Sequence, residues 1–209
     1  MLASILHKEL DKINLELKKA DKKEIKNMNF FHYTYENVLC EDLLIKQNPE
    51  RFQELLCLSG LVVSHSSRSF RIQEKTFLPP WVGIKLLTGQ SPTKTRAKKA
   101  CANFKILARD LLGCQVTMNK SQIYSTLSKC YILILPRLRG FEGFYEKQIN
   151  TKGFSFAVTN LLIFPELEEK ASFFEKIQGI NLSIQMNTQN KKQSALLLSG
   201  FQIPINFKY

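Results

Sequence analysis

Three short segments in the second half of the chain alternate between apolar and small polar residues. In 114–119 (CQVTMN), 153–160 (GFSFAVTN) and 180–187 (INLSIQMN), every second residue is apolar, and most of the others are Ser, Thr, Asn or Gln. Because successive side chains of a β-strand point to opposite faces, this alternation predicts strands with one buried face. Such strands suit an antiparallel sheet, which can leave one face in water. We therefore expect an α+β fold: a twisted, largely antiparallel sheet with helices packed on one face.

Other segments have helical spacing or end at helix-breaking residues. One further strand is expected at 61–63, within LSGLVVSHSS. The Pro79-Pro80 pair is expected to end whatever precedes it, because proline lacks an amide proton. Helices are expected at 30–47, at 81–88 followed by Gly89, at 121–138 with Pro136 as its stop, at 166–177, and at 190–201 with Gly200 as a C-cap.

The first part of the chain has the pattern of an amphipathic helix over 2–26. Its apolar residues recur every three or four positions, at Leu2, Leu6, Leu10, Ile13 and Leu17. Such a helix docks on a neighbour or lies on its own domain, and the sequence leaves both open. A chain of 209 residues suits one domain with an appendage. We therefore divide it into an N-terminal helical extension, 1–28, and a domain, 29–209.

The net charge indicates a polyanionic partner. The chain has 30 Lys and Arg against 18 Asp and Glu, a formal charge of +12. A charge this far from zero favours partners such as nucleic acid or an anionic membrane surface. No apolar run approaches the ~18 residues that cross a bilayer, and YILIL at 131–135 ends at Pro136. A nucleic acid is therefore the expected partner, with no membrane association.

The cysteines, histidines and serines of this chain do not have the spacing of a known metal-binding or catalytic motif. The five cysteines lack any CxxC pair, so we expect reduced, packed thiols instead of a zinc site or disulfide framework. His7, His32 and His65 form neither a ligand pattern nor part of a triad. The SHSSRS stretch at 64–69 places a histidine among serines without a nucleophile elbow or phosphate loop. We therefore expect no enzyme activity, no cofactor and no metal.

The segment 89–114, GQSPTKTRAKKACANFKILARDLLGC, holds six cations and one anion, Asp110. A charge run is usually a solvated surface. In this one, hydroxyl residues that can bond phosphate oxygens are interleaved with the cations, and Phe104 offers a ring for base stacking. The RNA-binding candidates in this segment are Ser91, Thr93, Lys94, Thr95, Arg96, Lys98, Lys99, Phe104, Lys105 and Arg109.

A second cationic cluster has arginine next to aromatic residues. Arg137 and Arg139 neighbour Phe141 and Phe144, and arginine both pairs phosphates and stacks on bases. We add both arginines to the RNA-binding candidates. No helix-turn-helix or zinc-finger pattern is present, so structured RNA is favoured over DNA. The small, uncharged face of the predicted sheet suits close approach to an RNA backbone, although alternation alone favours an ordinary solvated face.

Several motifs in one order resemble the large-subunit ribosomal protein family called L five. The matching stretches are Gly89-Gln90, TRAKK at 95–99, FKI at 104–106, GCQVTM at 113–118, PRLRGFEGF at 136–144, GFSFAVTNLLIFPEL at 153–167, QGINLSIQMNT at 178–188 and LLSGFQIP at 197–204. FHYTYENVLCEDLLIK at 31–46 resembles the first helix of the family's mitochondrial form. Residues 58–80 depart from the pattern, in a region that helps the family contact 5S rRNA, and 1–28 have no counterpart.

The resemblance implies a structural role in the central protuberance of the large ribosomal subunit. The implied partners are 5S rRNA, large-subunit rRNA or both, neighbouring ribosomal proteins and the small-subunit head. In the family, the segment matching 91–113 is a long protruding loop that faces the elbow of the P-site tRNA, so its cations would contact tRNA as well as rRNA. The resemblance and the composition favour the mitochondrial matrix, with an organelle gene, over a plastid or a bacterial cytoplasm. The alternative is a free-standing RNA-binding regulator or assembly factor built on the same domain.

Overall fold

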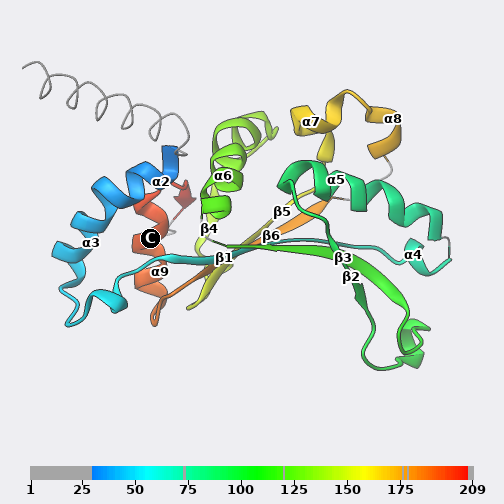
Figure 1. Ribbon diagram of the computed structural model, residues 1–209, viewed down its shortest axis with the longest axis horizontal. Helices are drawn as coiled ribbons and strands as arrows, with labels where there is room; N and C mark the ends of the chain where they lie inside the picture. The colour runs from blue at the N-terminus through cyan, green and yellow to red at the C-terminus, as the bar shows by residue number, and fades with distance from the viewer. Residues whose placement is uncertain (1–29, 73, 120, 176, 178, 207–209) are drawn as a thin grey trace, which may run out of the picture.

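A five-stranded antiparallel sheet in the order β2-β3-β1-β6-β5 forms the centre of the molecule (Figure 1). The computed structural model describes residues 30–72, 74–119, 121–175, 177 and 179–206, and the helix expected at 2–26 lies outside them. The strands of the sheet are β1 (Leu58–Ser66), β2 (Thr93–Arg96), β3 (Leu111–Met118), β5 (Gly153–Val158) and β6 (Ile180–Met186). A separate parallel pair joins β4 (Phe144–Tyr145) to β7 (Ile205–Asn206).

Helices cover one side of this sheet and one of its ends. Figure 1 shows α4 to α8 along one side, while α2, α3 and α9 pack together at one end. Contacts join α5 to β1 and β3, and α6 to β1. The helices are α2 (Phe30–Thr34), α3 (Cys40–Gln47), α4 (Ser69–Ile72), α5 (Leu78–Thr88), α6 (Ser121–Lys129), α7 (Pro165–Glu168), α8 (Ala171–Phe174) and α9 (Lys191–Gly200).

The strand register gives the sheet two different faces. Its buried face carries Leu61, Val63, Cys114, Val116, Met118, Phe154, Phe156, Val158, Ile180, Leu182, Ile184 and Met186. Directly paired residues on the opposite face form rows of small side chains, Thr93–Gln115–Ser64–Asn181 and Thr117–Val62–Ser183–Ser155. In the second row the hydroxyls of Ser155 and Ser183 are hydrogen-bonded at 3.0 Å. The expected α+β fold is confirmed, and we call the second surface the polar sheet face.

The Pro79-Pro80 pair begins a helix, which corrects the expectation that it ends one. Helix α5 starts at Leu78, so both prolines lie in its first turn. Amide protons in that turn have no acceptor within the helix, and the fixed φ of proline already suits it. Gly89 follows the helix with a left-handed φ of 70°, as expected. The proline pair therefore marks the start of α5 and not the end of the segment before it.

Gly200 is the last residue of α9 and not its C-cap, which is Phe201. The left-handed residue after this helix is Gln202, with φ of 57°. A Cβ added at Gly200 would lie 3.0 Å from a methyl carbon of Leu39, between α2 and α3. The glycine therefore serves close helix packing, a long-range role that the local sequence does not reveal.

Three other expected elements are present with changed bounds. Strand β1 has nine residues instead of three. The helix expected over 121–138 is α6 continued by a π-helical turn, Cys130–Ile134, and a 3-10 turn, Leu135–Arg137, that contains Pro136. The helix expected at 166–177 is divided into α7 and α8.

A buried histidine links β1 to the residue before β6. The side chain of His65 is 5% exposed, and its Nδ1–H donates to the carbonyl oxygen of Gly179. The imidazole ring also lies 5.4 Å from the ring of Phe70. Burial lowers the pKa of His65, because desolvation disfavours the charged ring more than the hydrogen bond to Gly179 favours it.

Acid should weaken the fold through His65. The unfolded chain titrates near the ordinary histidine pKa of ~6.5, and the folded chain below it. The His65 contribution is therefore complete above pH ~6.5 and is lost as the pH falls toward the folded pKa. Urea unfolding at neutral pH and at about pH 5 measures the loss. His65→Asn, which keeps a donor near Gly179, should show a weaker pH dependence, and equal pH dependence in both proteins would contradict the assignment.

Replacing Gly113 or Gly83 with alanine should have opposite effects on the stability of the fold. A Cβ at Gly113 would lie 2.2 Å from the carbonyl oxygen of His65, whereas a Cβ at Gly83 would be 3.6 Å from the ring of Phe174, an ordinary contact. We expect Gly113→Ala to lower the free energy of unfolding by about 1–3 kcal/mol, as overpacking does. Gly83→Ala should leave it unchanged or raise it by up to ~1 kcal/mol through helix propensity. Denaturant titrations of both variants test the pair, and a loss of the same size in both would refute the close approach.

Candidate nucleic-acid interface

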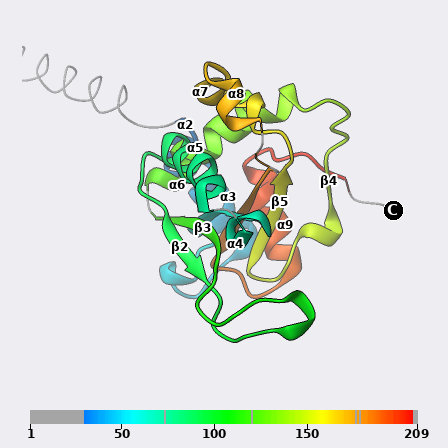
Figure 2. The same ribbon diagram turned by 90° about the vertical axis from the view of Figure 1, so that its right-hand side faces the viewer.

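Strands β2 and β3 and the residues between them form a basic hairpin that extends away from the rest of the sheet (Figures 1 and 2). We call the connecting residues, 97–110, the hairpin tip. Ala97 N–H donates to the carbonyl of Asp110, and Arg109 N–H donates to that of Ala97, both at 2.9 Å. An isolated antiparallel β-bridge, made by backbone hydrogen bonds between Cys101 and Ile106, closes the far end of the hairpin tip. The expected protruding loop is therefore a folded hairpin with its own hydrogen bonds.

The cations of the hairpin face solvent, while its one acidic residue bonds to the backbone. The exposed cations are Lys94, Arg96, Lys98, Lys99, Lys105 and Arg109. The carboxylate of Asp110 accepts the N–H of Leu107 at 2.8 Å. A guanidinium N–H of Arg96 donates to the carbonyl oxygen of Arg109 at 3.3 Å. The hairpin thus presents positive charge on a backbone that its own side chains help to hold.

The strand alternation of β2 sorts the candidate residues onto two faces. Thr93 and Thr95 pair with Gln115 and Gly113 on the polar sheet face, and the hydroxyl of Thr93 donates to the Gln115 carbonyl at 3.0 Å. Lys94 points to the other face, where its ammonium lies 5.5 Å from the centre of the Phe77 ring. Hydroxyls and cations that alternate in the sequence therefore do not share one surface in β2.

Just before β2, the backbone is tied to α5. The indole N–H of Trp81 donates to the carbonyl of Pro92 at 3.1 Å, so the entry to the hairpin has a fixed position. The neighbouring candidate, Ser91, is exposed. At the exit, Gly113 lies against the backbone of β1, as the 2.2 Å approach of its added Cβ to His65 indicates. The hairpin is thus anchored at both ends.

Two residues of the hairpin tip have an uncommon backbone conformation. Lys105 and Arg109 adopt left-handed φ angles of 54° and 71°. Residues with a Cβ avoid this region, at a cost of about 1–2 kcal/mol each. Such conformations persist where the surrounding structure determines them, and they are often found at functional sites. Both positions carry cations, which supports a binding role for the tip.

The second cationic cluster lies apart from the hairpin. Segment 135–140 follows α6 on the helix side of the sheet, and the hairpin tip lies across the molecule in both views (Figures 1 and 2). Arg137 donates to the carbonyl of Ile163 at 3.4 Å and lies 3.9 Å from a carboxylate oxygen of Glu168. Arg139 is exposed. The two candidate clusters therefore do not form one continuous site.

The aromatic neighbours of this second cluster, Phe141 and Phe144, belong to the core or pack against it. Phe144 is only 6% exposed, and the half-buried Phe141 packs edge-on against it with ring centres 4.9 Å apart. Phe104 in the hairpin tip is different, because its side chain is 62% exposed. The ring that the sequence analysis proposed for stacking, Phe104, is thus accessible to solvent.

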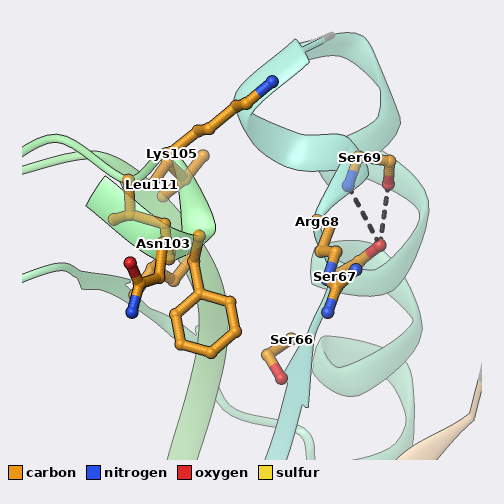
Figure 3. A pocket seen from close by; sticks show the side chains of 10 residues that line it. Ser66, Ser67, Arg68, Ser69, Asn103, Lys105 and Leu111 are labelled. Carbon is orange, nitrogen blue, oxygen red and sulfur yellow. Dashed lines mark hydrogen bonds between the residues drawn. The ribbon is translucent and has the colours of Figure 1, made fainter. Parts of the chain in front are cut away.

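A cleft that the sequence analysis did not predict separates the hairpin from the loop after β1 (Figure 3). Its volume is about 820 Å³, and its two walls are 66–69 and 103–106. Both walls come from segments that the sequence analysis had singled out, but only the fold brings them together. A signal was present in the serines and Arg68 of SHSSRS, a composition that suits anion binding without suiting catalysis.

The described residues offer neither a metal-binding cluster nor, at Cys114 and Cys130, a reactive thiol. No cluster of three or more His, Cys, Asp or Glu side chains among them could hold a metal ion. Burial raises the pKa of the Cys114 thiol to about 11 and that of the Cys130 thiol to about 12, which disfavours the reactive thiolate. Among these same residues, no helix has the length and apolarity that a membrane span requires.

Removing the Asp110 carboxylate should loosen the hairpin tip locally. We expect faster amide hydrogen exchange at Leu107 and across 97–110 in Asp110→Ala, because the 2.8 Å bond is removed. Exchange in β1 and β6 should stay at the wild-type level, since the tip contributes little to the core. Mass spectrometry of exchanged peptides resolves the regions. Unchanged protection of the tip would mean that the carboxylate does not stabilise it.

Comparisons with known proteins agree on one family. Residues 111–205 match the family model that describes the C-terminus of ribosomal protein L5. The large ribosomal subunit protein uL5m of Reclinomonas americana is 33% identical over 180 residues, 86% of this chain and 99% of that protein. The protein of the same name from Prototheca wickerhamii is 27% identical over 186 residues, 81% of this chain and 80% of its own length. These two relatives are of the mitochondrial type. The chain therefore belongs to the ribosomal L5 family, whose members are non-enzymatic structural proteins of the large ribosomal subunit.

Proposed function

We propose that this protein is a structural constituent of the mitochondrial large ribosomal subunit that binds rRNA in the central protuberance. The observation that carries the proposal is the basic hairpin, whose exposed cations stand away from the rest of the sheet (Figure 1). The rRNA is 5S rRNA, large-subunit rRNA or both. The mitochondrial names of its relatives support a site of action in the mitochondrial matrix.

The hairpin and the polar sheet face would contribute to RNA binding in different ways. Exposed lysines and arginines bind phosphates, release counterions and make affinity fall steeply with salt. The polar sheet face has no charged side chain in its central rows, and its Ser, Thr, Asn and Gln groups can bond 2′-hydroxyls and phosphate oxygens at short range. Charge thus supplies affinity, and the polar rows permit close approach.

The projection of the hairpin tip suits a second RNA partner. A segment that extends beyond the sheet can reach past rRNA bound to the body of the protein, and we propose that it meets the elbow of the P-site tRNA. Arg137 and Arg139, on the other side of the molecule, are available to rRNA or to neighbouring ribosomal proteins. Other surfaces would face the small-subunit head.

Charge reversal tests the hairpin. We expect Arg96→Glu, Lys98→Glu and Lys99→Glu together to weaken the binding of rRNA and tRNA. The slope of the logarithm of the binding constant against the logarithm of the salt concentration should become shallower, by roughly one unit for each phosphate that the variant no longer binds. The circular dichroism spectrum should not change, since all three side chains are exposed. An equal change of charge at Lys46, Arg51 and Lys192, on the exposed surface at the α3–α9 end, is the matched control. Equal loss of binding in both triple variants would reduce the effect to net charge.

Ultraviolet crosslinking in intact cells identifies the RNA. Large-subunit rRNA joined to the polar sheet face, with tRNA joined to the hairpin tip, is the expected outcome. Scattered messenger RNAs without rRNA would overturn the ribosomal role in favour of a free-standing regulator. Crosslinks confined to precursor rRNA would indicate an assembly factor.

A further inference from the structure

The cleft beside the hairpin has the size of a small-molecule site and two unlike walls. Its volume of about 820 Å³ lies within the ~300–1,000 Å³ of ligand pockets. Figure 3 shows Ser66 to Ser69 on one wall, with Asn103, Lys105 and Leu111 opposite them. Because one wall belongs to the loop after β1 and the other to the basic hairpin, a bound group would contact both segments at once.

The wall after β1 offers hydroxyls and a cation on a held backbone. The N–H of Ser67 donates to the carbonyl of Leu112 at 3.2 Å, which joins this wall to β3. The hydroxyls of Ser67 and Ser69 are 2.8 Å apart, and Ser69 N–H donates to the Ser67 hydroxyl at 3.3 Å. Arg68 is exposed beside them. Arginine and serine hydroxyls are ligands that proteins use for phosphate oxygens.

The opposite wall offers surfaces for a base. Ile106, Leu111 and Leu112 are half-buried and provide an apolar floor. Phe104 is 62% exposed at the cleft and provides an aromatic ring. The amide of Asn103 can both donate to and accept from the polar edge of a base. A flat, apolar group with a polar edge therefore fits this side.

An unpaired nucleotide carries both kinds of group, a phosphate and a flat base with a polar edge. We infer that the cleft binds a single nucleotide extruded from an RNA helix, with its base on Phe104 and the apolar floor and its phosphate against Arg68 and the serine hydroxyls. Extruded bases are held in this manner, by stacking and by hydrogen bonds to their edges. The inference rests on the proposed RNA-binding function and adds to it the recognition of an unpaired nucleotide.

Two short RNA duplexes test this site. One carries a single bulged 2-aminopurine and the other is fully paired, so the only difference between them is the unpaired nucleotide. Fluorescence anisotropy of the full-length protein with each duplex gives the Kd values. We expect about tenfold tighter binding of the bulged duplex, in the range that stacking of one base on an aromatic side chain provides. The 2-aminopurine emission should also rise on binding, as the base leaves the helix stack.

Substitutions in the cleft test whether it causes the preference for the bulged duplex. Phe104→Leu and Arg68→Gln should each remove most of the difference between the two Kd values, and Phe104→Tyr should keep it. Phe173→Leu, at a 39% exposed ring on α8, is the matched control and should bind both duplexes as wild type does. Equal, salt-dependent binding of both duplexes by wild type, or a preference that survives both cleft variants, overturns the cleft site and leaves the proposed function standing. Failure to bind either duplex, together with the absence of any rRNA crosslink in cells, overturns both.

Discussion

The antiparallel pairing of β1 with β3 is the interaction on which the rest of the structure depends. Six successive pairs, from Leu61 with Met118 to Ser66 with Gly113, place apolar side chains on one face and small polar ones on the other. The same pairing directs β3 beyond the end of β1, so the basic hairpin stands away from the sheet. A slip of one residue would exchange the two faces and turn the core outward.

This register separates stability from binding. The core lies between the buried face and the helices, where His65 and the packed phenylalanines are found. The polar sheet face and the hairpin contribute few apolar contacts to that core. Charged or polar substitutions on these surfaces can therefore change the RNA contacts that we propose for them while the fold persists.

Local periodicity in the sequence predicted most of the fold. The alternation in 114–119, 153–160 and 180–187 is a direct record of one buried face, and these segments are strands. The Pro79-Pro80 expectation was wrong for a local reason, because prolines suit the first turn of a helix as well as the residues after one. The Gly200 expectation was wrong because of a distant contact. Gly200 looked like a helix cap because the sequence does not show Leu39 beside it.

The candidate site was predictable to a similar degree. The cations of the hairpin form one run in the sequence, so their shared position was expected, and the structure places all six on the exposed hairpin. The cleft joins residues about 40 positions apart, and neither wall alone indicates a site. Only the β1–β3 pairing brings Arg68 close to the hairpin wall, so this part of the surface required the fold.

The left-handed backbone at Lys105 and Arg109 has a consequence for how such a hairpin changes over time. Glycine or asparagine would relax the backbone at either position, so selection for stability alone favours losing the charge. Selection for a polyanionic partner opposes that drift. If the proposed RNA contact is made at the hairpin tip, a homologue that has lost this contact should accumulate glycine or asparagine at these two positions before its core changes.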